Sequence, residues 1–211
     1  MLDLLVRDAI VVDGGGGAPF AASIAVADGR IVSIDRGEDG RVRGGNGQPG
    51  RAASGARVVN ADGLVVAPGF IDVHTHSDLA PFTDPWMDSA LRQGVTTVVV
   101  GNCGMSAWPR GGLPRMASFL GASAETLPHW TAFGEYLAAV DAARPACNVA
   151  ALVGFGSLRA EVMGHERRPA TAAEIGVMRR LLDEAMQAGA AGMSSGLIYV
   201  PDMSEGASRS R

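Results

Sequence analysis

Short apolar runs separated by polar turns fill the first 66 residues, a pattern typical of β-strands. Runs at residues 4–12 and 23–26 predict two strands, and Asp28-Gly29 followed by the run at 30–34 predicts a hairpin with a two-residue turn. Segment 36–57 is rich in glycine and poor in apolar residues, so we expect a flexible loop. Residues 1–66 are therefore predicted to form a small β-sandwich-like domain.

From residue 67 the pattern changes to apolar, β-branched strands that alternate with segments of helical periodicity. Repeated strand–helix units imply a parallel sheet, open or closed into a barrel. A closed (β/α)₈ barrel needs about 250 residues, so residues 67–201 would supply its first four strands, and the polar residues 202–211 are expected to be an unstructured tail left by truncation. The predicted strands lie at 64–73, 95–101, 147–153 and 190–200, and the predicted helices at 84–93, 130–144 and 171–189.

Candidate chemistry first occurs at the end of the apolar run 64–73, where His74 and His76 are separated by one residue and flanked by Asp72 and Asp78. Side chains alternate along a strand, so the two imidazoles are expected on one side, with Cα atoms roughly 6.5 Å apart. That spacing allows both to bind one metal ion. The C-terminal end of a strand is also where parallel α/β folds carry out chemistry.

A cysteine follows the next predicted strand, at the same end of the sheet as the histidine pair. The thiolate of Cys103 is a zinc ligand of the expected type. A buried free cysteine that only packs is the alternative, but the neighbouring histidine pair favours a role as ligand. We therefore predict a metal site made by His74, His76 and Cys103.

Composition narrows the class of protein. The chain has 211 residues, is 47% hydrophobic and carries a net charge of −4 without any basic block, which argues against nucleic acid and anionic membranes as partners. All 18 basic residues are arginine, so no lysine can act as a base or as a carbamylated metal ligand. No run reaches the roughly 18–20 apolar residues of a membrane span, the N-terminus lacks the features of a signal peptide, and two cysteines suit a cytoplasmic protein with free thiols.

Four segments carry a resemblance to a known family. Residues 67–78 read Ala-Pro-Gly-Phe-Ile-Asp-Val-His-Thr-His-Ser-Asp, which resembles the amidohydrolase superfamily. Residues 94–104 (Gly-Val-Thr-Thr-Val-Val-Val-Gly-Asn-Cys-Gly), 153–159 (Val-Gly-Phe-Gly-Ser-Leu-Arg) and 192–201 (Gly-Met-Ser-Ser-Gly-Leu-Ile-Tyr-Val-Pro) are similar to its N-acyl-D-amino-acid deacylase (D-aminoacylase) family. The resemblance runs from residue 2 to about residue 201, and corresponds to the N-terminal portion of that family.

The resemblance implies a zinc-dependent amide hydrolase that converts a small N-acyl-D-amino acid into a D-amino acid and a carboxylate. It implies that Cys103 helps to hold a tightly bound zinc ion, together with two histidines from later strands, and that His74 and His76 face a second metal position. A general-base aspartate and the later histidines are expected beyond residue 211. The chain alone is therefore expected to be inactive.

The resemblance leaves alternative functions open, and the sequence departs from the family pattern at one position. The alternatives are an amidohydrolase acting on cyclic amides or dipeptides, and a non-catalytic remnant. Ser194, Ser195 and Tyr199 end the fourth predicted strand, and Ser195 and Tyr199 are our candidates for substrate binding. The family usually has Gly-His-Gly where this chain has Phe155 between two glycines, which puts the substrate class in question.

Overall fold

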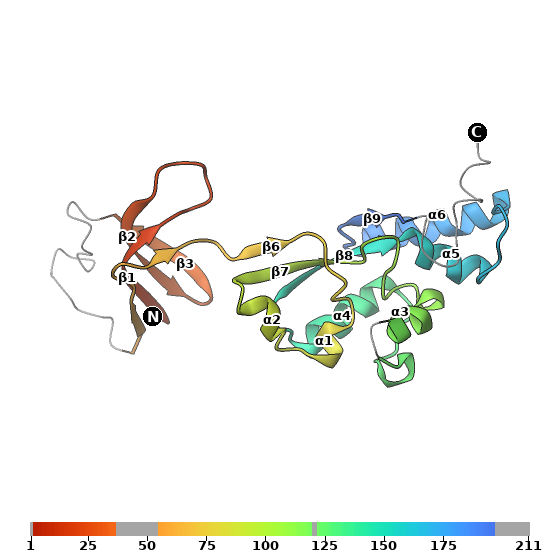
Figure 1. Ribbon diagram of the computed structural model, residues 1–211, viewed down its shortest axis with the longest axis horizontal. Helices are drawn as coiled ribbons and strands as arrows, with labels where there is room; N and C mark the ends of the chain where they lie inside the picture. Colours follow the sequence, from red (N-terminus) through yellow and green to blue (C-terminus); the bar gives the residue numbers. More distant parts are fainter. Residues whose placement is uncertain (1, 37–54, 120–121, 197–211) are drawn as a thin grey trace. The chain divides into compact units, whose positions relative to one another are not determined.

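The computed structural model describes residues 2–36, 55–119 and 122–196 (Figure 1). The chain divides into two compact units, Met1–Pro68 and Gly69–Arg211. Most of the loop expected at 36–57, the tail expected at 202–211, and Tyr199 lie outside the described residues. Among the described residues, no helix combines the length and the apolar character that a membrane crossing requires.

The first unit is built on one mixed sheet. Strand β1 (Leu4–Val11) pairs antiparallel with β2 (Phe20–Ala27) and parallel with both β4 (Arg57–Asn60) and β5 (Val65–Val66), while β3 (Arg30–Asp35) pairs with β2. The predicted hairpin is confirmed: Asp28 and Gly29 link β2 to β3, and both have positive φ, 50° and 68°, as a type I′ turn requires. The hydrophobic core of the first unit consists of Ala9, Val11, Ala22, Ile24 and Ala61.

The prediction of a single buried strand at 64–73 is wrong. The run is divided between β5, in the first unit, and β6 (Phe70–Asp72), in the second, because Pro68 lacks the N–H that a strand interior needs. β6 is also exposed rather than buried, with Phe70 64% and Ile71 63% accessible. Within the described residues β6 is the edge of its sheet, so its apolar side chains lack a second neighbouring strand.

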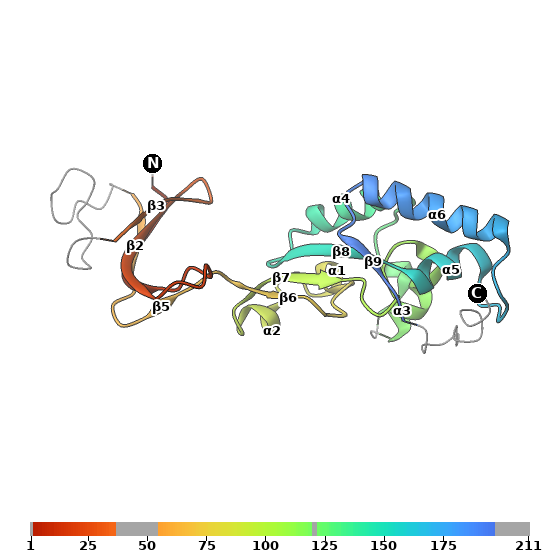
Figure 2. The same cartoon turned by 90° about the horizontal axis from the view of Figure 1, so that it is seen from above.

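The second unit is a parallel sheet in the order β6-β7-β8-β9, which agrees with the predicted repeats of strand and helix. Strands β7 (Val95–Val100), β8 (Asn148–Gly154) and β9 (Gly192–Ser194) follow one another through helical connections. Helices α4 (Phe133–Ala143) and α6 (Ala172–Gln187) cover one face of the sheet (Figure 2). The core between sheet and helices includes Val98, Val100, Ala151, Val153, Tyr136, Val140, Met178 and Ala185.

The helices differ from the prediction in three places. The helix expected at 84–93 is shorter, α2 (Asp88–Leu91), because the left-handed Met87 precedes its first residue, and a separate short helix, α1 (Ala80–Thr83), lies before the predicted range. The irregular stretch after β7 contains a helix, α3 (Leu113–Phe119), flanked by the 3₁₀ turns η1 (Arg110–Gly112) and η2 (Ala124–Thr126). A further helix, α5 (Phe155–Met163), begins directly where β8 ends.

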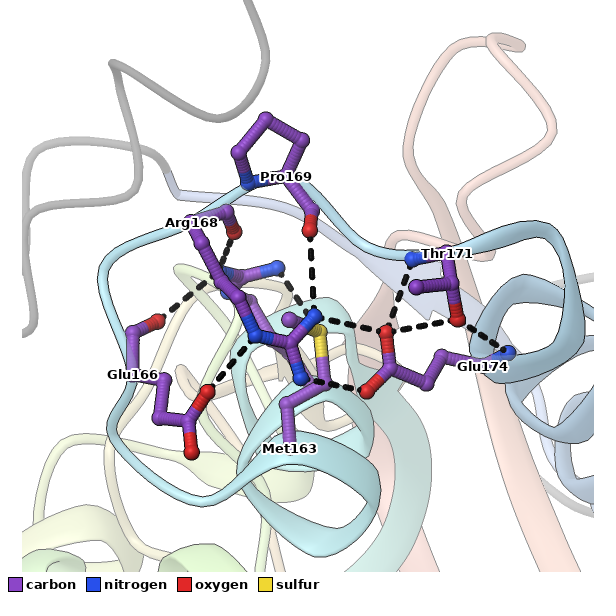
Figure 3. Close-up of polar contacts among 7 residues, drawn as sticks. Met163, Glu166, Arg168, Pro169, Thr171 and Glu174 are labelled. Atoms are coloured by element: carbon purple, nitrogen blue, oxygen red, sulfur yellow. Dashed lines mark hydrogen bonds and ion pairs between the residues drawn. The ribbon is translucent and has the colours of Figure 1, made fainter.

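Charged side chains fasten the connection between α5 and α6 (Figure 3). Arg168 forms ion pairs with Glu166 and Glu174, each at 2.6 Å. The predicted capping box is confirmed, since the Thr171 hydroxyl accepts a hydrogen bond from the backbone N–H of Glu174, and the Glu174 carboxylate accepts one from the N–H of Thr171. Glu174 thus serves both the ion pair and the helix start.

The pH dependence of stability tests this arrangement. The Arg168 side chain, and then the Thr171 N–H, lower the pKa of Glu174 from 4.5 to about 2. A folded-state pKa below the unfolded value contributes stability above pH 4.5 and loses it as the pH falls towards 2. We expect Glu174→Gln to lower the urea midpoint at pH 7, and the difference from wild type to shrink over that window. Glu184→Gln, at an exposed position of the same helix, is the control, and a pH-independent difference would contradict the assignment.

Candidate metal centre

The structure brings together the three predicted ligands. His74 and His76 lie in the loop after β6 and Cys103 lies in the loop after β7, its parallel neighbour. One ligand atom from each residue lies within 4.8 Å of those of the other two, and the His74 Nε2 to Cys103 Sγ distance is 3.2 Å. His74 is exposed and the other two are partly buried, so the cluster is open to a ligand from solution.

The geometric reason given for the histidine pair was wrong, although the pair itself converges. β6 ends at Asp72, so His74 and His76 lie in the loop that follows it and not at alternate positions of a strand. Asp72 shapes that loop, since its Oδ1 accepts a hydrogen bond of 3.1 Å from the N–H of His74. The two imidazole rings meet edge to face with their centroids 5.9 Å apart.

The cluster fits a zinc ion by the chemistry and spacing of its donors. Two imidazoles and a thiolate are among the common ligands of zinc, at about 2.0–2.3 Å from the ion. Atoms bound tetrahedrally at such distances lie roughly 3.5 Å from one another. The His74–Cys103 distance is already close to this value, and the other separations do not exceed 4.8 Å.

The loop that carries Cys103 is a left-handed turn. Gly101, Cys103 and Gly104 have φ values of 80°, 57° and 75°. Asn102 ties this turn to the histidine loop, because its side-chain amide donates to the carbonyls of Val99 and Thr75 at 2.9 and 3.3 Å. The two ligand-bearing loops are thus joined through Asn102 without the help of an ion.

Ser194, at the end of β9, has a structural role in the site that sequence reasoning did not assign. Its hydroxyl accepts a hydrogen bond of 2.9 Å from the N–H of Gly104 and donates one to the carbonyl of Gly101. It therefore closes the turn on both sides of Cys103. The sequence placed a serine pair here, but a pairing across 90 residues leaves no local signal in the sequence.

The remaining candidates lie around this turn. Ser195 is exposed, and its backbone carbonyl carbon lies 3.3 Å from the place that a Cβ on Gly104 would occupy. Phe155 is the first residue of α5, partly buried and packed against the core. Packing thus accounts for an apolar side chain at this position.

A parallel strand–helix sheet with a histidine–cysteine cluster at its C-terminal edge is the architecture of barrel-type proteins with a metal centre above the strands. The chain belongs to the amidohydrolase family, whose family model matches residues 57–207. The structure accordingly corresponds to the first part of a TIM-type barrel preceded by a small β domain.

The curated relatives of this chain include deacylases from bacteria. An N-acyl-D-aspartate deacylase of Alcaligenes xylosoxydans xylosoxydans is 41% identical over 94% of this chain and 37% of its own length. A D-aminoacylase of the same organism is 39% identical over 94% of this chain and 38% of its own length. The chain therefore spans somewhat less than two fifths of these curated relatives.

Deacylases are also found among the solved structures that resemble this chain. The N-acyl-D-glutamate deacylase of Bordetella bronchiseptica, solved with zinc and a phosphonate mimic of the tetrahedral intermediate, superposes with a TM-score of 0.77 at 38% identity. The match covers 95% of this chain and 40% of the deacylase. An L-hydantoinase from Arthrobacter aurescens, at 20% identity and a TM-score of 0.52, shares the fold.

The bridging role of Ser194 predicts a specific loss of stability. Ser194→Ala leaves the N–H of Gly104 and the carbonyl of Gly101 without their partner. We expect the free energy of unfolding to fall by about 1–3 kcal/mol, measured by urea denaturation. Ser195→Ala is the matched control, because Ser195 is exposed and its side chain makes no hydrogen bond within the described residues. Equal effects of the two substitutions would contradict the bridge.

Proposed function

We propose that this chain provides the cysteine–histidine part of the metal centre of a zinc-dependent N-acyl-D-amino-acid deacylase. The observation that carries the proposal is the convergence of His74, His76 and Cys103 at the C-terminal edge of β6 and β7. The deacylase relatives, at about 40% identity over nearly the whole chain, support the type of reaction.

The ligands have different roles in this proposal. Cys103 binds as an anion, and it takes the place of a carbamylated lysine in a chain that has no lysine. His74 and His76 bind through neutral imidazoles, and Asp72 holds the backbone of His74 in place. A zinc ion held there would supply Lewis-acid polarisation of the scissile amide and would lower the pKa of a water molecule.

Other groups complete the reaction in this proposal. We expect a general-base aspartate, and two further histidine ligands, outside these 211 residues. Ser195 and Tyr199 are proposed to contact the small acyl-amino-acid substrate, because both follow β9 in the sequence and Ser194, the last residue of β9, contacts the Cys103 turn. The free thiols Cys103 and Cys147 favour a cytoplasmic location.

Zinc content is the direct test of the metal centre. We expect the purified 211-residue chain to retain zinc after dialysis, and Cys103→Ala to reduce the affinity at least tenfold, measured by competition with a chromophoric chelator. Cys147→Ala is the matched control, since Cys147 is buried in the core away from the cluster. Equal zinc binding by wild type and Cys103→Ala would overturn the ligand assignment.

Substrate class requires a complete barrel. The chain is fused to the part of the Alcaligenes N-acyl-D-aspartate deacylase that lies beyond the region of similarity, and release of the free amino acid is measured. We expect hydrolysis of N-acetyl-D-aspartate or N-acetyl-D-glutamate and no hydrolysis of the L-enantiomers. Preference for hydantoins or dipeptides would support the alternative amidohydrolase reaction. A chimera that binds zinc and folds but hydrolyses none of these substrates would favour the non-catalytic remnant.

A further inference from the structure

Ser106 and Ser157 are two buried serines beside the Cys103 turn that the proposed reaction does not use. Ser106 lies three residues after Cys103, and Ser157 lies in the first turn of α5. Only 3% and 4% of their surfaces are exposed. A buried hydroxyl lowers stability unless it is hydrogen-bonded, so the partners of these two hydroxyls identify what they hold together.

The Ser157 hydroxyl bonds both polar backbone groups of Ser106. Its Oγ accepts a hydrogen bond of 2.9 Å from the N–H of Ser106 and donates one of 3.1 Å to the carbonyl of the same residue. A Cβ on Gly112 would lie 3.0 Å from this Oγ, so the backbone of η1 also packs closely against it. The hydroxyl of α5 thus serves a single residue of the loop after β7.

The Ser106 hydroxyl makes the reciprocal connection. It accepts a hydrogen bond of 2.8 Å from the N–H of Gly154, the last residue of β8, and it donates one to the carbonyl of Trp108. Each serine therefore binds the backbone of the segment that carries the other. We call this pair, Ser106 and Ser157, the serine clamp.

The serine clamp is continuous with the turn that presents Cys103. The backbone N–H of Ser157 donates a hydrogen bond of 3.2 Å to the carbonyl of Gly104, whose N–H is held by Ser194. Gly104 is thus fixed from β9 on one side and from α5 on the other. Cys103 directly precedes it with a φ of 57°, a conformation that persists in a non-glycine residue only where the surroundings hold it.

We propose that Ser106 and Ser157 are positioning residues for Cys103: the serine clamp anchors the loop after β7 on the first turn of α5 and so fixes the place of the thiol relative to His74. The consequence for metal binding rests on the proposed function. The consequence for the loop does not, because it concerns the protein without metal.

Hydrogen exchange measured by mass spectrometry tests the loop directly in the metal-free 211-residue chain. The variants are Ser157→Ala and Ser106→Ala, each of which removes one hydroxyl of the serine clamp. Val140→Ala is the control, because Val140 is a buried core residue that lines a cavity with Cys147 and Asn148, at the beginning of β8 and not at its end. Urea denaturation measures the loss of stability in all three variants.

We expect each serine variant to speed exchange in peptides that cover residues 101–106 about tenfold, the effect of losing roughly one buried hydrogen bond. Val140→Ala is expected to lower stability without faster exchange in this loop. Unchanged exchange in both serine variants would overturn the proposal. So would equal acceleration of the loop in Val140→Ala at an equal loss of stability. If only one serine variant folds, that variant decides the outcome.

Cobalt binding adds a second readout. The charge-transfer absorption between thiolate and Co²⁺ reports ligation by Cys103, and we expect each serine variant to weaken Co²⁺ binding about tenfold, as the loss of an outer contact of a metal site does. Val140→Ala is expected to bind Co²⁺ as wild type does. If wild type binds no Co²⁺ but the loop loosens in the serine variants, the proposed metal centre fails while the positioning role stands. Cobalt affinity equal to wild type in a variant with a loosened loop would overturn the link from the serine clamp to ligation.

Discussion

The site depends on close contact between backbones at the turn of residues 101–104. A Cβ on Gly101 would lie 2.2 Å from the carbonyl oxygen of Leu152, and one on Gly154 would lie 2.5 Å from the carbonyl of Gly104. Both distances are well below a permissible contact, so the turn is seated against β8 only because these positions are glycine. The place of Cys103 is thus set by backbone packing and by the two side chains that brace the turn, Asn102 and Ser194.

Much of the fold was predictable from local patterns. The hairpin at Asp28-Gly29 and the capping box at Thr171 were found because turn and cap residues act over two to four positions. The exposure of β6 was not predictable, because an apolar run does not reveal how many neighbours a strand has. Helix α5 was missed for a related reason: its apolar face is weak, and it buries Arg159 through contacts with the following loop.

Prediction of the site followed residue type more closely than geometry. His74, His76 and Cys103 were identified because zinc favours these donors and because the ends of parallel strands meet at one edge. The side chains that hold the Cys103 turn in place could not be predicted from the sequence. Asn102 acts through its contact with Thr75, and Ser194 acts across two strands. The burial of Asp78, which is only 1% exposed, was not predicted either, because burial is decided by tertiary packing.

The spacing of these contacts along the chain has a consequence for the order in which the site forms. His74 and Cys103 are 29 residues apart, whereas Gly104 and Ser194 are 90 residues apart. Closing the shorter loop costs less chain entropy, and contacts of low sequence separation form sooner. During synthesis, the proposed metal ligands therefore meet before β9, which carries Ser194, has emerged.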